Sequence, residues 1–138
     1  MSKKLYRKIK KVPLYPCRLG VLVCKSYKEV NKFLLSQGMP EEFDFSEYVG
    51  STITRGVVKE KGKELFCIYI VLNPKEEGFT HGLISHEVRH ATNAILEHIG
   101  QRLDPNNDEA EAYLSGWVAD MVYNVLNLGG NIRKLKIV

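Results

Sequence analysis

The sequence predicts an α+β protein, in which a small, mostly antiparallel sheet is combined with an N-terminal helix and two longer helices near the C-terminus. Two observations predict it. Short apolar runs bounded by turn residues fill much of the first half, and two long segments with apolar residues at helical spacing fill the second. With 138 residues, 44% of them hydrophobic, the chain is expected to form a single domain over residues 1–138 with its own core.

Two elements are expected near the N-terminus. Residues 18–24 (RLGVLVC) form an uninterrupted apolar run, which is typical of a buried strand. Residues 26–37 have apolar side chains on one helical face, so they predict an amphipathic helix. Ser26 is a suitable N-cap for this helix, and Gly38 is expected to end it.

A β-hairpin is expected in the middle of the chain. An acidic, irregular stretch at 39–50 precedes two strand-like runs at 52–59 and 64–72. The glycine-containing segment 61–63 (KGK) between these runs supplies a turn. The two strands should therefore pair with each other.

Two long helices are predicted in the second half. The first begins after an N-cap at Thr80 and runs through Ile99 to Gly100, and the second covers about 108–127 and ends at Gly129-Gly130. The first has an expected core stripe of Ile84, Val88, Ala91, Ile95 and Ile99. The second has an apolar face of Leu114, Val118, Met121, Val125 and Leu128.

The first of these helices carries the segment His86-Glu87-Val88-Arg89-His90. Because a helix turns about 100° per residue, His86 and His90 project from one face about one turn apart, away from the core stripe. Two imidazoles so placed can hold one Zn²⁺, and Glu87 between them can act as general base on a metal-bound water. The alternative is an ordinary solvent-facing helix surface, because HExxH is short and also occurs by chance.

A catalytic zinc site needs a third protein ligand and keeps its fourth position open. Three acids at the start of the second long helix are candidates, namely Asp108, Glu109 and Glu111. Asp108 is short and suits a helix cap, and Glu111 points to the other side of the helix from Glu109, where it is expected to meet solvent or a surface partner. Glu109 is therefore the favoured ligand, and the small Ala112 one turn later would let this helix approach the histidines.

HEVRH followed by NDEAEAYLSG resembles the gluzincin branch of zinc metallopeptidases, which carry HExxH on one helix and Glu-x-x-Ala on the next. The matching residues are His86, Glu87, His90, Glu109 and Ala112. Size and layout are similar to minigluzincins and to small phage-encoded metallopeptidase-like proteins. The resemblance implies a zincin-like fold, a catalytic Zn²⁺, a peptide or protein substrate and an edge strand at Glu64–Leu72 along which the peptide binds.

Two further residues are weighed as parts of the site. Tyr113 replaces the Asp or Asn that many gluzincins have after the alanine. One turn from Glu109, it can donate a hydrogen bond to the oxyanion, and it is predicted as a catalytic residue; a packed aromatic ring with a solvated hydroxyl is the alternative. His81 can line the cleft, but a histidine in a first helical turn is more often simply exposed.

Basic residues crowd the N-terminus, at Lys3, Lys4, Arg7, Lys8, Lys10 and Lys11. Such a cluster can bind nucleic acid or an acidic partner. No aromatic-interleaved or helical nucleic-acid motif accompanies the charge, so residues 1–12 are expected to form a solvated arm or a charged edge strand.

The expected location is the cytoplasm, and a phage-infected bacterial host would suit the resemblance. No run of about 20 apolar residues is present to span a bilayer, and the N-terminus lacks the apolar stretch of a secretory signal. Cys17, Cys24 and Cys67 lie in or beside apolar runs and are predicted to be buried free thiols. The sequence does not define an oligomeric state.

The predicted activity is zinc-dependent hydrolysis of peptide bonds. The leading alternative is a catalytically silent binding module of the same fold, whose basic N-terminus engages a protein or nucleic-acid partner. A third reading is a small accessory protein without a metal. Cleavage of peptides from a synthetic library separates the first two hypotheses. The zinc coordination also separates them, because an open fourth position that holds water favours the enzyme.

Overall fold

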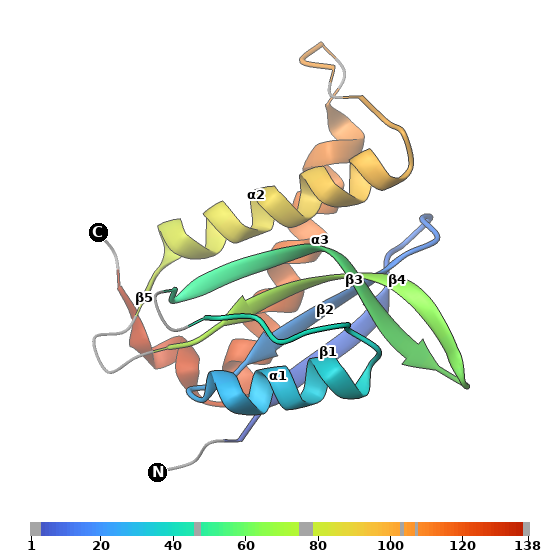
Figure 1. The fold of residues 1–138 in the computed structure, drawn as a ribbon. Coiled ribbons are helices and arrows are strands. Elements are labelled where there is room, and N and C mark those ends of the chain that lie inside the picture. The colour runs from blue at the N-terminus through green and yellow to red at the C-terminus, as the bar shows by residue number, and fades with distance from the viewer. Residues whose placement is uncertain (1–3, 46–47, 75–78, 103, 107, 137–138) are drawn as a thin grey trace.

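The computed structural model describes residues 4–45, 48–74, 79–102, 104–106 and 108–136, and it confirms the α+β class (Figure 1). The main sheet consists of β1 (Tyr6–Lys11), β2 (Arg18–Val23), β3 (Gly50–Glu60) and β4 (Lys63–Leu72). The helices are α1 (Tyr27–Ser36), α2 (His81–His98) and α3 (Glu109–Leu128). Two short strands that the sequence did not predict, β5 (Phe79–Thr80) and β6 (Leu135–Lys136), pair in parallel, and a 3-10 turn over Asn131–Lys134 precedes β6.

The main sheet is mixed, with the strand order β1-β2-β4-β3. The pairs β1–β2 and β3–β4 are antiparallel, whereas β2 and β4 run parallel, so two of the three pairings agree with the predicted antiparallel arrangement. The expectation that Glu64–Leu72 is an edge strand is wrong. Strand β4 is internal because β2 pairs with its residues Cys67–Leu72, and the edge on this side of the sheet is β3.

The two inner strands are buried on both faces, which explains their continuous apolar sequences. On one face lie Leu19, Val21, Val23, Ile68, Ile70 and Leu72, covered by α2 and α3. On the other face lie Leu22, Cys24, Cys67, Tyr69 and Val71, covered by α1 and the segment that follows it (Figure 1). All three cysteines are buried and outside any disulfide bond, as predicted.

Strands β3 and β4 form the predicted hairpin. Lys61 (φ 51°) and Gly62 (φ 78°) make its turn in the left-handed region, which the two-residue hairpin turn requires. The pairing register shifts between Ile53 and Gly56, so β3 has an irregularity at Thr54 and Arg55, and both of these side chains are exposed.

The helices begin and end close to the predicted positions. The hydroxyl of Thr80 accepts a hydrogen bond from the Leu83 N–H at 3.1 Å and so caps α2, and Gly100 follows α2 with a φ of 75°. Ser26 occupies the N-cap of α1, but its side chain makes no capping hydrogen bond, contrary to the prediction. Leu128 is 55% exposed rather than buried, because it is the last residue of α3 and lies beyond the core.

The basic N-terminus contributes an edge strand, one of the two forms predicted for it. Within the described ranges, strand β1 has β2 as its one partner, and Arg7, Lys10 and Lys11 on it are exposed; Lys3 lies outside those ranges. Charged side chains on an edge strand discourage pairing with other chains. None of the helices in the described part of the chain has the length and apolarity needed to cross a membrane.

Candidate metal centre

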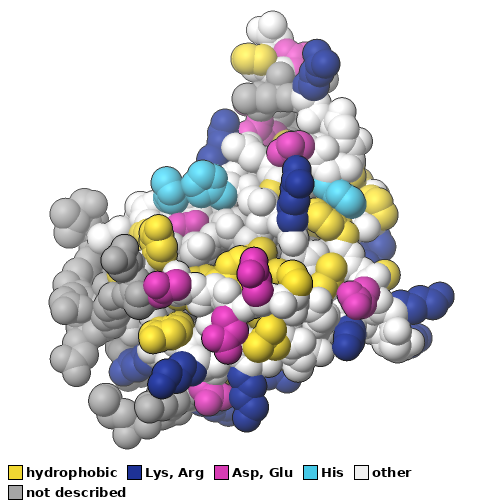
Figure 2. All heavy atoms as spheres, viewed as in Figure 1, with side chains coloured by type: hydrophobic (Ala, Val, Ile, Leu, Met, Phe, Trp, Pro, Cys, Tyr) yellow, Lys and Arg dark blue, Asp and Glu magenta, His cyan; other side chains and the backbone are white. Residues whose placement is uncertain are grey.

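The predicted histidine pair lies on the exposed side of α2. His86 and His90 are both exposed, and their Nε2 atoms are 3.1 Å apart. The ring planes are nearly perpendicular, at 83°, with centroids 4.6 Å apart. In Figure 2, histidine side chains gather at the surface over this helix. Ile84, Val88, Ala91 and Ile95 are buried on the opposite side, so the pair lies off the core stripe as predicted.

The separation of the two Nε2 atoms suits a metal ion or a proton bound between them. Two imidazole nitrogens at the usual zinc distance and a tetrahedral angle are about 3.3 Å apart, close to the 3.1 Å here. Two unprotonated lone pairs at this distance would repel each other, so the arrangement needs a proton or a metal ion between them. The chemistry of the pair therefore fits zinc, and an N–H···N hydrogen bond between the rings is the metal-free equivalent.

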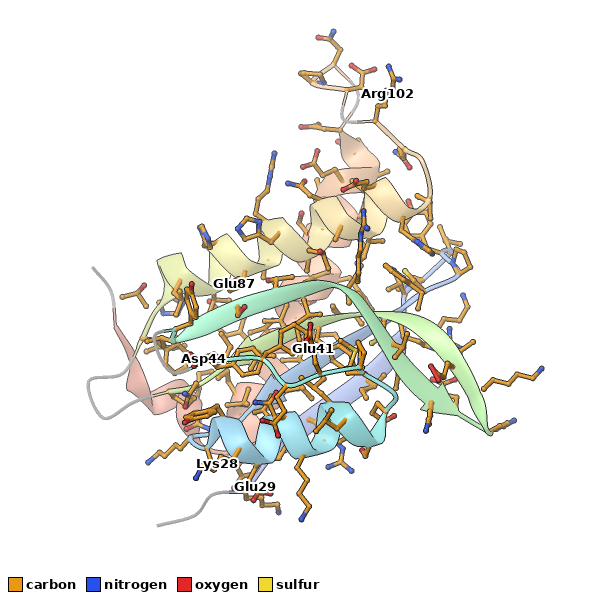
Figure 3. All side chains as sticks on the ribbon, viewed as in Figure 1. Lys28, Glu29, Glu41, Asp44, Glu87 and Arg102 are labelled. Carbon is orange, nitrogen blue, oxygen red and sulfur yellow. The ribbon has the colours of Figure 1, made fainter. Side chains whose placement is uncertain are left out.

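Glu87 points from α2 towards the edge strand β3, as labelled in Figure 3. Its side chain is 3% exposed. The hydroxyl of Thr52 on β3 donates to Glu87 Oε1 at 2.9 Å and lies 3.3 Å from the Glu87 carbonyl oxygen. Strand and helix together therefore hold one carboxylate oxygen in place.

The second carboxylate oxygen of Glu87 remains available. In the described part of the chain, the Thr52 hydroxyl contacts Oε1 and the carbonyl oxygen of Glu87, and no hydrogen bond involves Oε2. Gly50 lies directly beside it, because a Cβ at residue 50 would be 3.2 Å from both Cγ and Oε2 of Glu87. The glycine gives the carboxylate its space, and Oε2 is the atom that can accept a proton.

The structure does not bring Glu109 to the histidines. Glu109 is exposed at the first position of α3 and lines a shallow hollow of about 460 Å³ with Ala112, Tyr113, Gly116, Trp117 and Asp120. Within the residues that the structure describes, no three His, Cys, Asp or Glu side chains form a group that could hold a metal ion. The role of Glu109 as third ligand therefore stays a prediction.

Glu111, by contrast, faces α2. Its carboxylate forms an ion pair with Arg89 at 3.0 Å and is 11% exposed. The expectation that Glu111 points to solvent is therefore wrong, and so is the expectation that Ala112 lies between the helices, since Ala112 is exposed. The contact between α2 and α3 is made instead by Glu111, Ser115 and the apolar residues that follow, with Ser115 donating to Thr92 at 3.2 Å.

The two accessory residues lie at different places. Tyr113 is 78% exposed on α3 beside Glu109, so its catalytic role also stays a prediction. His81 is exposed at the first position of α2, and its Nδ1 lies 2.7 Å from the hydroxyl of Tyr123 on α3. Partial burial raises the pKa of the Tyr123 hydroxyl above its ordinary value, further from neutral pH. His81 thus ties the two helices together away from the histidine pair.

Sequence reasoning missed three residues of this site. Thr52 and Gly50 shape the surroundings of Glu87, but they lie more than 30 positions earlier in the chain, and no local pattern connects them with α2. Arg89 lies inside the motif and pairs with Glu111. The sequence contains a signal for this pair, because Glu111 is an acid on the apolar face of the next helix and such an acid needs a cation.

Comparisons with protein-family models, with curated proteins and with solved structures gave no match to this chain.

Proposed function

We propose that the protein is a zinc-dependent peptidase, with Zn²⁺ held by His86, His90 and Glu109 and with Glu87 as general base. The observation that carries the proposal is the convergence of two exposed imidazole nitrogens to 3.1 Å, with a fixed carboxylate at the next position along the helix. Burying a carboxylate is unfavourable without a partner, and here the Thr52 hydroxyl supplies one, which holds Glu87 beside the two histidines.

The residues have distinct tasks in this proposal. Zinc, when bound, lowers the pKa of a coordinated water and polarises the substrate carbonyl. Glu87 accepts the proton at Oε2 and later delivers it to the leaving amine. Thr52 holds Oε1, so that the carboxylate keeps one orientation during both transfers. Tyr113 is the proposed hydrogen-bond donor to the oxyanion.

The substrate class follows from the free edge of β3. This strand pairs with β4 on one side, and among the described residues its other edge has no strand partner (Figure 1). On that strand the Val57 and Lys59 N–H groups already donate to Met39 Sδ and Gln37 Oε1, so the edge open to a peptide is the part before Gly56, beside Thr52. An exposed strand edge binds extended peptides by adding them to the sheet. Because Thr52 of the same strand contacts Glu87, a peptide on this edge would pass the proposed base.

A catalytically silent binding module is the second candidate. One observation favours it, namely that α3 directs Glu111 rather than Glu109 towards α2, so that in the described residues the histidine pair has no third side chain placed to complete a metal site. A site with two histidine ligands holds zinc weakly. In this reading the free β3 edge binds a peptide without cutting it.

Zinc content and hydrolysis test the proposal together. Protein purified without chelator or immobilised metal is expected to contain about one zinc per chain by elemental analysis. It should cleave members of a synthetic peptide library, and Glu87→Gln should keep the zinc while losing hydrolysis, because the amide cannot accept a proton. Absence of zinc, together with no thermal shift on adding Zn²⁺, would refute the metal site. Zinc without cleavage would favour the binding module.

A further inference from the structure

A second hollow lies along α2 from the histidine pair, between this helix and the β3–β4 hairpin. Its volume is about 310 Å³. It is lined by Thr54, Arg55, Phe66, Ala94, Glu97 and His98. These residues come from α2, β3 and β4, and the first two of these elements also carry the candidate metal centre.

Helix geometry gives the distance between the two places. His90, Ala94 and His98 follow one another at four-residue intervals, and the eight residues from His90 to His98 rise about 12 Å along the helix axis. On β3, Thr52 contacts Glu87, and Thr54 and Arg55 reach the hollow. An extended chain advances about 3.3 Å per residue, so a peptide on the β3 edge covers this distance in three to four residues.

The irregularity in β3 directs Arg55 to the hollow. Bulges re-aim side chains at the point where they interrupt a strand, and here the register shift falls at Thr54 and Arg55. Among the described residues, the Arg55 side chain has no recorded ion pair or hydrogen bond. Its guanidinium is therefore free to bind a ligand.

The other lining residues supply a rigid wall and further donors. The ring of His98 stacks on Phe66 with centroids 3.8 Å apart and planes within 6°, which fixes the imidazole position. His98 and Thr54 each offer a hydrogen-bond donor beside the five N–H groups of Arg55. Glu97 is the one acidic side chain of the lining. Donors therefore outnumber acceptors.

We propose that this hollow is a carboxylate-binding subsite, in which Arg55 selects peptides with an acidic group three to four residues from the bond opposite the histidine pair. The carboxylate can belong to an Asp or Glu side chain or to the C-terminus of the peptide. This inference rests on the proposed function for the direction of the peptide, and it adds the specificity of the site. A guanidinium binds a carboxylate through two parallel hydrogen bonds, which a lysine cannot reproduce.

Binding of fluorescein-labelled octapeptides to the full-length Glu87→Gln variant tests the proposal without turnover. The probes are alanine- and serine-based, carry one Glu or one Gln at each position in turn, and end in an amide. A second set has a free C-terminal carboxylate and no Glu. Fluorescence anisotropy is expected to show about fivefold tighter binding for Glu than for Gln at one position, the size expected for a partly exposed ion pair.

Variants of the lining identify the group responsible. In the Glu87→Gln background, Arg55→Ala should abolish the preference for Glu and Arg55→Lys should reduce it, whereas Glu97→Gln should increase it by removing a like charge. Lys59→Ala is the matched control, because it removes an exposed positive charge from the same strand and should leave the preference unchanged. If only the probes with a free C-terminal carboxylate bind more tightly, the subsite is supported and its ligand is the C-terminus of the peptide.

Several outcomes would overturn the proposal: equal binding of Glu and Gln probes, tighter binding of a lysine probe, a preference that survives Arg55→Ala, or no binding of any probe at millimolar concentration. The zinc and hydrolysis measurements are independent of these. A Glu preference without zinc would leave the subsite standing and refute the peptidase. Zinc and cleavage without a Glu preference would refute the subsite alone.

Discussion

Removing Arg89 and removing Glu111 should lower the free energy of unfolding by different amounts, although both substitutions break the same ion pair. The Glu111 side chain is 11% exposed and the Arg89 side chain 58% exposed. Glu111→Ala leaves a guanidinium that water can solvate, so the expected loss in the free energy of unfolding is about 1 kcal/mol. Arg89→Ala leaves a carboxylate without its partner in the α2–α3 interface, and the expected loss is about 2–3 kcal/mol.

Urea denaturation of the metal-free protein at neutral pH measures both losses. The double variant Arg89→Ala/Glu111→Ala contains no buried carboxylate that has lost its cation, so it should be more stable than Arg89→Ala alone. If Arg89→Ala costs no more than Glu111→Ala, or if the double variant is the least stable of the three, Glu111 is not buried against α2 and the reasoning fails.

The same helix separates stability from metal binding. Glu109 is exposed, so Glu109→Ala should leave the unfolding midpoint unchanged while weakening zinc binding. Glu111→Ala should do the reverse, because it removes an ion pair and not a ligand. Competition with a zinc-binding dye compares the two variants. Equal losses of zinc affinity, or a larger loss for Glu111→Ala, would show that Glu109 is not the third ligand.

Three further predictions concern the surroundings of Glu87 and the core. Thr52→Val removes the donor to Glu87 and should lower kcat about tenfold at unchanged zinc content, so an unchanged rate would exclude a positioning role. Gly50→Ala places a Cβ 3.2 Å from the carboxylate and should also lower kcat, whereas Gly82→Ala, whose Cβ would meet only the Thr80 hydroxyl at 3.6 Å, should not. Burial raises the pKa of Cys67 from 9.0 to about 12. The contribution of the Cys67 thiol to the free energy of unfolding should therefore be complete below about pH 9 and fall by about 1.4 kcal/mol per pH unit up to pH 12. In Cys67→Ala the alkaline loss of stability should be smaller by this amount, and the loss that remains comes from Cys17, Cys24 and Tyr69, whose pKa values burial also raises.

Local patterns were sufficient to predict most of the secondary structure. The apolar run at 18–24 and the two predicted hairpin strands correspond to β2, β3 and β4, because short apolar runs between turn residues are typical of strands. The long helices were also predicted, because Thr80 and Gly100 bound α2 with ordinary capping chemistry. These signals are short in range, so a single sequence contains them.

Pairings between distant segments were not predictable in the same way. The parallel pairing of β2 with β4 makes β4 internal, and nothing in either strand specifies that neighbour. The contact of Thr52 with Glu87 depends on that strand order, because it places β3 at the edge beside α2. The base of the proposed reaction was therefore predicted from its motif, but the residues that hold it were not.

The apolar pattern of α3 already indicates which face of this helix is buried, but the metal-binding motif favoured Glu109 over Glu111 as the residue that faces α2. Glu111 precedes Leu114 by three positions and Val118 by seven, so it lies on the stripe that the core buries, whereas Glu109 shares the exposed stripe of Tyr113. Burying each of these apolar side chains contributes about 1.5–3 kcal/mol, which outweighs the placement of one exposed carboxylate. An acid on the buried stripe then needs a cation, and Arg89 supplies it.

Zinc binding through Glu109 consequently cannot come from rotating α3, because rotation would expose its apolar face and break the pair between Arg89 and Glu111. A change confined to the first turn is less costly. Glu109 is the first residue of the helix, and the backbone bond that closes this turn runs from the Ala112 N–H to the Asp108 carbonyl oxygen at 2.9 Å. The loss of one such bond costs about 1 kcal/mol, far less than a zinc ligand contributes. The zinc-bound protein is therefore expected to keep the buried face of α3 and to differ from the metal-free protein in the turn that carries Glu109.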